Sequence, residues 1–182
     1  MNRHIGKLVG TTLVLMGLVG VSKSWATNPT DATITVTPTA TVSLAVSPTT
    51  YAFGPLAVNT SSTSASAITL TNDGQVGETV AKKILTQSTP AGWTAAASAS
   101  VDQYVLYVAT ATARPGSFAS ATKYGAQGNS TALTDDNGTD IGTMNTSGAT
   151  STASLWFKLD MPSSVTATTA RTITVEFTGT GQ

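Results

Sequence analysis

The part of the chain best equipped to bind a ligand is an acidic loop at residues 135–140, with the sequence DDNGTD. Oxygen donors packed around a glycine are the ligands that Ca²⁺ prefers, and exported proteins meet calcium at high concentration. Asp135, Asn137 and Thr139 alternate as the first ligands of an EF-type loop do, and Asp140 adds a carboxylate. The glycine stands at the fourth place of the loop instead of the sixth, and no Glu follows at the twelfth. Calcium is therefore the one candidate cofactor, and a solvated acidic turn is the alternative.

Two aromatic residues are candidates for a carbohydrate-binding platform, because aromatic rings stack on the apolar faces of sugars. Trp93 follows Pro-Ala-Gly in a predicted turn and Tyr124 lies in a polar segment, so we expect both to be exposed. Three other aromatic residues stand next to apolar neighbours, as core residues do; they are Tyr104, Tyr107 and Trp156. We expect core packing to account for most of the five.

Catalytic chemistry has little support in the residue types. No histidine or cysteine occurs after residue 26, which removes the usual general bases, nucleophiles and zinc ligands. Only two glutamates are present, Glu78 and Glu176, and no pair of carboxylates has a spacing typical of a glycosidase. Serine and threonine are abundant, but no base or lysine partner stands out to activate one of them. We therefore expect no catalytic residue and no enzyme activity.

Residues 1–26 have the three parts of a secretory signal peptide. Basic residues precede an uncharged apolar run at 8–21, and residues 24–26 (SWA) place small residues at the −3 and −1 positions. Cleavage before Thr27 would release the chain as a secreted protein, extracellular or held at the cell surface. A transmembrane anchor is the alternative, but a bilayer core requires about 20 apolar residues and this run has fourteen. We expect no membrane insertion after cleavage.

The chain that follows this segment has 156 of the 182 residues, enough for one domain with its own core. It has six basic and nine acidic residues, and Lys82-Lys83 is its only adjacent basic pair, which we expect on the solvated surface. Because no basic cluster is present, nucleic acid and anionic membranes are not expected partners. The absence of cysteine means that stability must come from β-packing, bound ions or neighbouring copies of the chain.

Hydrophobic residues recur with period two along most of this chain, which predicts β-strands. The expected strands are residues 32–37, 39–46, 51–56, 67–71, 80–86, 103–110, 151–159 and 170–177. A polar insertion at 111–149 is rich in Gly, Ser, Asn, Asp and Thr, and is either functional or built of weak hairpins. No segment has convincing helical periodicity. The pattern predicts an all-β fold for residues 27–182, an antiparallel immunoglobulin-like β-sandwich with Greek-key connections, with a closed β-barrel as the alternative.

Residues 47–76 resemble the opening of immunoglobulin-like sandwich modules of the ASH type. They have a proline, an aromatic residue ahead of Phe-Gly, a polar connection, and an apolar strand that ends in Thr-Asn-x-Gly. Residues 91–93 (AGW) and 155–157 (LWF) look like segments of secreted bacterial β-proteins with the same opening. The resemblance implies a fold and no catalytic residue, because its motifs are turn glycines and core aromatics. The insertion at 111–149 departs from it.

These observations favour a secreted structural protein of the cell surface or extracellular matrix that self-assembles into fibres or arrays. The segment 27–37 precedes Pro38 and contains the expected strand 32–37, in which Ile34 and Val36 share one face. Donated to a neighbouring copy, this strand would fill an apolar groove and satisfy edge hydrogen bonds. We thus expect a homo-oligomer or polymer. The alternative is that the strand pairs within its own domain.

A second hypothesis is a binding module for surface glycans or other surface proteins, with its site formed by Trp93 and the insertion at 111–149. An exposed Trp93 in a monomeric protein would favour this hypothesis. A buried Trp93 in a self-assembling protein would favour the structural role.

Overall fold

The computed structural model describes residues 33–124, 127–148 and 150–182, and residues 38–182 belong to one compact unit. The strands are β1 (Leu44–Ser47), β2 (Ser61–Thr63), β3 (Ile68–Asn72), β4 (Glu78–Thr89), β5 (Thr94–Ala95), β6 (Gln103–Thr110), β7 (Thr131–Ala132), β8 (Thr143–Met144), β9 (Thr152–Asp160) and β10 (Thr172–Gly181). One 3-10 turn, η1 (Ser120–Thr122), is the helical element of these residues. No helix in the described ranges has the length and apolar character that a membrane crossing requires. The expected all-β class is confirmed.

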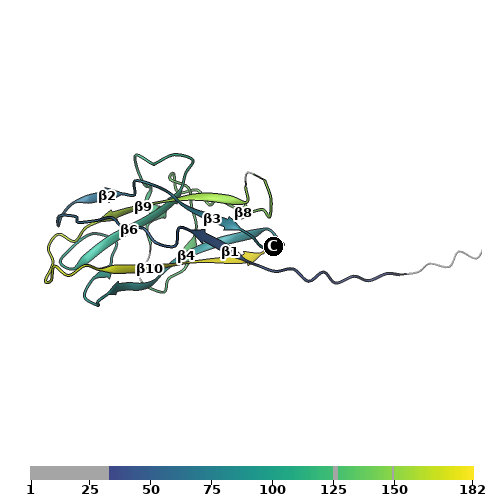
Figure 1. Ribbon diagram of the computed structural model, residues 1–182, viewed down its shortest axis with the longest axis horizontal. Coiled ribbons are helices and arrows are strands. Elements are labelled where there is room, and N and C mark those ends of the chain that lie inside the picture. Colours follow the sequence, from purple (N-terminus) through teal and green to yellow (C-terminus); the bar gives the residue numbers. More distant parts are fainter. Residues whose placement is uncertain (1–32, 125–126, 149) are drawn as a thin grey trace, which may run out of the picture. The chain divides into compact units, whose positions relative to one another are not determined.

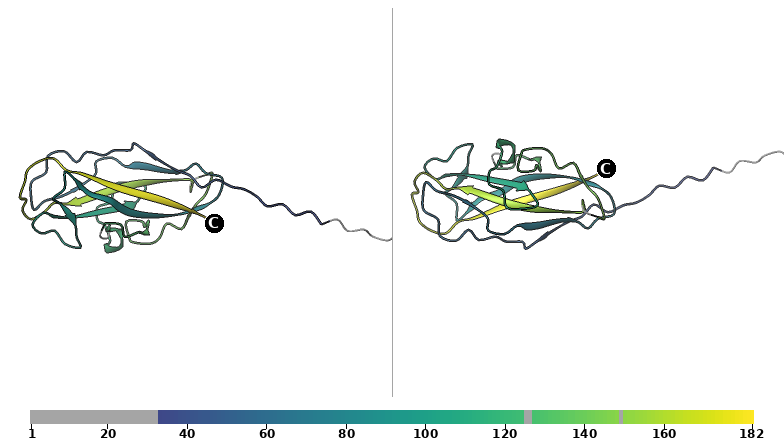
Figure 2. Two further views of the ribbon diagram at one scale, coloured as in Figure 1. Left: turned by 90° about the horizontal axis from the view of Figure 1, so that it is seen from below. Right: turned by 90° about the horizontal axis from the view of Figure 1, so that it is seen from above.

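The strands form two sheets (Figures 1 and 2). The larger has the order β1-β3-β9-β6-β5, with β2 also paired to β9, and the smaller has the order β10-β4-β7, with β8 also paired to β4. The pairing of β5 with β6 is parallel, so the larger sheet is mixed and the expectation of a wholly antiparallel fold is wrong there. The reason is that residues 96–102 carry the chain back over a tight turn in which Asp102 has φ 54°. The described strands make two separate sheets, so the closed barrel does not form.

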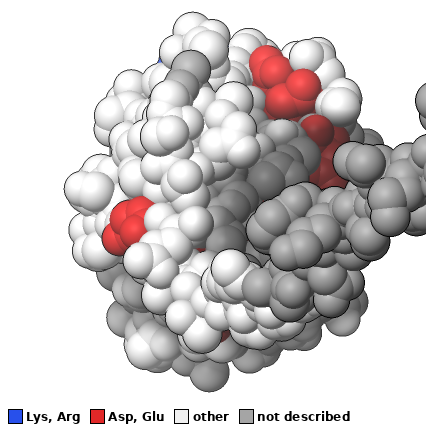
Figure 3. All heavy atoms as spheres, turned by 90° about the vertical axis from the view of Figure 1, so that its right-hand side faces the viewer, with Lys and Arg blue, Asp and Glu red and all other residues white. Residues whose placement is uncertain are grey.

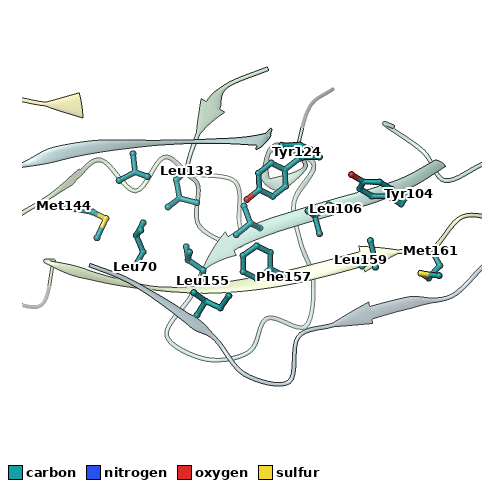
Figure 4. Close-up of a cluster of buried hydrophobic side chains, with 14 residues drawn as sticks. Leu70, Tyr104, Leu106, Tyr124, Leu133, Met144, Leu155, Phe157, Leu159 and Met161 are labelled. Carbon is teal, nitrogen blue, oxygen red and sulfur yellow. The ribbon is translucent and has the colours of Figure 1, made fainter. Parts of the chain in front are cut away.

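Both sheets contribute side chains to one apolar core. Leu70 from β3 and Leu155 from β9 in the larger sheet are labelled in Figure 4. They belong to the same cluster of buried side chains as Val80 and Ile84 from β4 in the smaller sheet. Each of these side chains is buried, because alternate residues of a strand point to the same face. Full burial of such a side chain contributes about 1.5–3 kcal/mol relative to exposure, so this core is the main source of stability.

The predicted strands that become β3, β4, β6, β9 and β10 are confirmed, with ends that differ by a few residues. Only the end of the predicted strand 39–46 becomes β1. Residues 51–56 form no strand, because Gly54 has φ 72° and Pro55 offers no N–H to a ladder. The short strands β2, β5, β7 and β8 escaped prediction because two or three residues are too few to show a period.

The polar insertion at 111–149 is part of the fold. Its strands β7 and β8 pair with β4, on the edge opposite β10. Leu133 is fully buried beside them, and its N–H donates to the carbonyl of Val80 at 2.9 Å. On the other sheet, the N–H of Tyr124 donates to the carbonyl of Leu106 at 2.9 Å. The insertion therefore closes the side of the fold between β4 and β6 by pairing with existing strands. Residues 134–140 also form a short hairpin, with an antiparallel bridge between Thr134 and Asp140, so the alternative of weak hairpins is confirmed for this part of the insertion.

We predict that Leu133→Ala lowers the free energy of unfolding by about 2–5 kcal/mol, because it leaves a cavity under the insertion. The matched control is Leu85→Ala on β4, whose side chain is 47% exposed and should cost less than about 1 kcal/mol. Urea unfolding followed by circular dichroism measures both. Equal, small losses would mean that the insertion does not contribute to the core.

Candidate functional site

An apolar groove of about 980 Å³ opens between residues 49–56 and residues 167–175. We call it the β10 groove, because the first half of β10 forms one of its walls. It reaches core side chains of the larger sheet, several of which are labelled in Figure 4; they are Ile68, Leu106, Phe157, Leu159 and Met161. A groove that opens onto the core of a fold in this way is suited to an apolar occupant.

The wall formed by β10 has an unpaired backbone edge. β10 is hydrogen-bonded to β4 along one side and to no other strand in the described part of the chain. The outer N–H and C=O groups of β10 are therefore available to a further strand. Beside the groove, half-buried Ile173 and Val175 alternate with exposed Thr172 and Thr174, so the apolar face of β10 turns toward the core.

Trp93 and Arg171 stand together at the start of β10. The turn that carries Trp93 is held by Ser88, whose hydroxyl accepts the Trp93 backbone N–H at 3.0 Å. One guanidinium nitrogen of Arg171, Nη1, donates to the carbonyls of Pro90 and Ala91, each at 2.7 Å. The indole Nε1 of Trp93 and the Nε of Arg171 are both buried and have no hydrogen-bond partner in the described residues. Both residues line the β10 groove.

The two aromatic candidates for a sugar platform are not the exposed rings that the sequence predicts. Trp93 is half-buried, and its ring centroid lies 6.4 Å from that of the buried Tyr104. Tyr124 is 4% exposed and belongs to the core, where its hydroxyl has no partner among the described residues. The prediction is wrong for Tyr124 because the insertion folds inward to close the core. Trp93 still belongs to a candidate binding site, because it lines the β10 groove.

The acidic loop is organised by its own backbone. The Oδ1 atom of Asp135 accepts the N–H groups of Asn137 at 3.0 Å and Thr139 at 2.8 Å, and Asp140 accepts the N–H of Gly142 at 2.9 Å. Within the described ranges, no three acidic or histidine side chains are grouped so that they could hold a metal ion. The carboxylates therefore serve as turn formers here. Calcium binding at Asp135, Asn137, Thr139 and Asp140 stays a prediction.

Lys82 is fully buried, so the expectation of a solvated pair at Lys82-Lys83 is wrong for this residue. Its ammonium donates to the carbonyls of Val108 at 3.3 Å, Ala121 at 3.4 Å and Thr122 at 3.0 Å. It also lies 5.7 Å from the centre of the Tyr124 ring. Because β4 alternates between core and surface, Lys82 faces inward, and the carbonyls of β6 and of the insertion replace its water. Burial lowers the pKa of Lys82 to about 8.

A second polar cluster lies where β6, β9 and β2 run side by side. Asp160 accepts hydrogen bonds from the hydroxyls of Ser61 at 2.6 Å and Tyr107 at 3.0 Å, and it pairs with Lys158 at 2.9 Å. Burial, then the hydrogen bond to Asp160, raises the pKa of Tyr107 to about 12. Burial alone would raise the pKa of Asp160, but its three hydrogen bonds lower it overall. Neither group changes charge near pH 7, so the cluster holds strands together and offers no acid or base there.

The two candidate donor residues are the most exposed large apolar side chains of the described chain. Ile34 is 84% exposed and Val36 is 78% exposed. Residues 33–37 lie in no strand, so the expected strand 32–37 does not form in the described part; Ala32 lies outside the described residues, as do the signal segment 1–26 and residues 27–31. A solitary segment has no hydrogen-bonded neighbour to make it a strand.

We predict that the free energy of unfolding rises with pH where Lys82 titrates. The unfolded pKa of 10.5 exceeds the folded value of about 8, so the unfolded state binds more protons between these values and loses them as pH rises. Relative to Lys82→Met, the wild type should gain about 1–3 kcal/mol across this window. Urea titrations at pH 7.5 and about pH 10 measure the difference, with Lys83→Met as the surface control. A flat difference would show that the buried ammonium is not destabilised.

Comparison of the chain with known protein families, with curated proteins and with solved structures gives no match. Three features of the chain itself bear on its function: the β10 groove, the unpaired edge of β10, and the exposed apolar residues before Pro38.

Proposed function

We propose that this chain is a secreted structural protein of the cell surface or extracellular matrix, and that its copies join by strand donation. In this proposal, residues 27–37 of one copy enter the β10 groove of the next copy and pair with β10. The observation that carries the proposal is the open apolar groove beside an unpaired strand edge. An occupant must supply apolar side chains on one face and a backbone ladder along its edge, and an extended strand supplies both.

The strand order supports an immunoglobulin-like β-sandwich that lacks one strand. The order β1-β3-β9-β6 corresponds to strands A-B-E-D of that fold, and the pair β4-β10 corresponds to C-F. In the complete fold a strand G pairs with the free edge of F, antiparallel to it. The corresponding place here is the outer edge of β10, which is where the groove lies. A donated strand would take the place of strand G.

The core is covered differently on the two open sides of the sandwich. The insertion at 111–149 seals the side between β4 and β6, with Leu133, Tyr124 and Met144 buried beneath it. On the opposite side, several walls of the groove are only half-buried, among them Tyr51, Phe53 and Val175, whereas the core side chains that line it are buried. Because an incoming strand would remove the remaining apolar surface of these walls from water, this second side is the one that benefits from it.

The segment before Pro38 has the properties of a donor. Ile34 and Val36 alternate with threonines, so one face is apolar and the other can face solvent. Eleven residues in extended conformation span about 36 Å, which matches the roughly 33 Å of a ten-residue strand such as β10. The segment has a single charged residue, Asp31, and no basic one. Burying it in an apolar groove therefore removes little charge from water.

The first residues of the compact unit and the acceptor groove lie at opposite ends of β10. The chain enters the compact unit at the C-terminal end of β10, where Val42 packs beside Gly181 and Leu44 beside Gly179. The N–H of Ser43 is fixed there by the buried carboxylate of Glu78, at 2.7 Å. The groove adjoins the N-terminal half of β10, at the other end of this strand. A contact between opposite ends of two copies repeats without closing, which gives an open filament.

The surface chemistry agrees with close stacking of copies. The face drawn in Figure 3 shows few charged side chains, and those clearly visible are acidic and scattered. Charged residues make up 10% of the chain. Copies stacked end to end would therefore meet little electrostatic repulsion.

We predict that the chain from residue 27 onward forms filaments visible by negative-stain electron microscopy, and that the double substitution I34D/V36D abolishes them. Two buried carboxylates in an apolar groove would cost far more than the strand gains. The matched control is T33D/T35D, which places the same charges on the opposite face of the same strand and should still assemble.

Loss of filaments in both double variants would mean that charge alone prevents assembly. Monomers of the unsubstituted chain at every concentration would contradict the proposal, including the case in which residues 27–37 fill the groove of their own molecule. The hypothesis of a glycan- or protein-binding module would then lead. Sedimentation velocity distinguishes monomers from short oligomers that microscopy misses.

A further inference from the structure

Two hydrogen-bond donors at one end of the β10 groove have no acceptor. The indole Nε1 of Trp93 and the Nε of Arg171 are buried, and neither has a partner in the described residues. Both residues line the groove, at the end where β10 begins. A buried donor without an acceptor is rare in native proteins, because it has lost its water and gained nothing. Two of them in one groove indicate that an acceptor arrives with the occupant.

Other polar groups of both residues have partners, unlike Trp93 Nε1 and Arg171 Nε. The backbone N–H of Trp93 is bound by Ser88, and Nη1 of Arg171 donates to the carbonyls of Pro90 and Ala91. These contacts hold the two side chains in place without using Trp93 Nε1 or Arg171 Nε. Because both nitrogens are shielded from water, an incoming acceptor reaches them only after a small movement of the two side chains, and each buried donor then gains a partner.

We propose that Trp93 Nε1 and Arg171 Nε bind backbone carbonyls of the donated strand and so set its register on β10. This inference rests on the proposed strand donation and adds the residues that position the strand. The donated strand runs antiparallel to β10, as strand G does against F, so its C-terminal end reaches the start of β10. The carbonyls in question are those that adjoin Pro38 of the donor.

The chemistry of the donor at this point matches the two side chains. Pro38 has no N–H, so it cannot donate a backbone hydrogen bond to β10. The carbonyls next to Pro38 remain as acceptors, and Trp93 Nε1 and Arg171 Nε are unpartnered donors in residues that line this end of the groove. A strand shifted by one residue would turn Ile34 and Val36 away from the core and would misplace these carbonyls as well. The apolar face of Ile34 and Val36 and the carbonyls beside Pro38 therefore favour the same register of the donated strand on β10.

The test uses the two indole groups that the chain has from residue 27 onward, those of Trp93 and Trp156. The I34D/V36D chain serves as an acceptor that cannot assemble, and a synthetic peptide of residues 27–40 is the probe. We expect the indole N–H resonance of Trp93 to move downfield as the peptide binds. The resonance of Trp156, whose Nε1 already donates to the carbonyl of Ala111 at 3.0 Å, should stay in place.

Affinity supplies the second measurement. In the same acceptor chain, Trp93→Phe keeps an aromatic ring and removes the indole donor, and should weaken the peptide about fivefold to tenfold. Trp156→Phe removes an indole donor outside the groove and is the matched control, with unchanged affinity. Arg171→Lys keeps the positive charge and loses Nε, so it tests the second donor if Trp93→Phe does not fold.

The outcomes separate this inference from the function on which it rests. Saturable binding with a stationary Trp93 resonance and equal affinities for all variants would overturn the role of the two donors, while strand donation would stand. Absence of peptide binding to the acceptor chain, with its fold intact by circular dichroism, would overturn both. A downfield shift of the Trp93 indole N–H resonance, together with weaker peptide binding by the Trp93→Phe and Arg171→Lys variants, supports the inference.

Discussion

The structure depends on one constraint, which is that an apolar core between two sheets must be shielded from water along both of its open sides. The sheets cover its faces, but each sheet ends at an edge, and the core reaches the surface between those edges. The chain has no disulfide to hold such edges together. Every backbone group at an edge also needs a hydrogen-bond partner or water. The placement of the insertion and of the groove follows from how each side meets this constraint.

The side between β4 and β6 is closed by the insertion at 111–149, whose sequence has the composition of a polar loop. Its strands satisfy the edge of β4, and Leu133 and Tyr124 fill the space beneath. Lys82 joins the two halves of this seal, because its ammonium binds carbonyls of both β6 and the insertion. A buried cation without a carboxylate is costly, and three carbonyls and an aromatic ring offset part of that cost. The arrangement ties the insertion to one position.

Period-two patterns predicted the long strands well, because each of those strands has one face in the core and the pattern records that burial. They failed at positions decided by tertiary contacts. Lys82 looked solvated because it is charged and adjacent to Lys83, whereas the alternation of β4 turns it inward. Tyr124 looked exposed because its neighbours in the sequence are polar, and nothing local reveals that the insertion folds over the core. The groove forms between two segments that are far apart in the sequence, 49–56 and 167–175, so no local motif could predict it.

If assembly completes the fold, a donated strand can supply the stability that disulfides provide in other small secreted domains, which would explain why the chain needs no cysteine. A secreted domain of this size usually needs extra stabilisation when its core is partly open, and disulfides are the common source. A donated strand supplies buried apolar area and a backbone ladder, and both are lost when copies separate. Stability would then depend on protein concentration and on position in the filament. In the proposed arrangement the groove would be a functional surface that costs stability in the free subunit, and the contact between copies would gain strength by covering it.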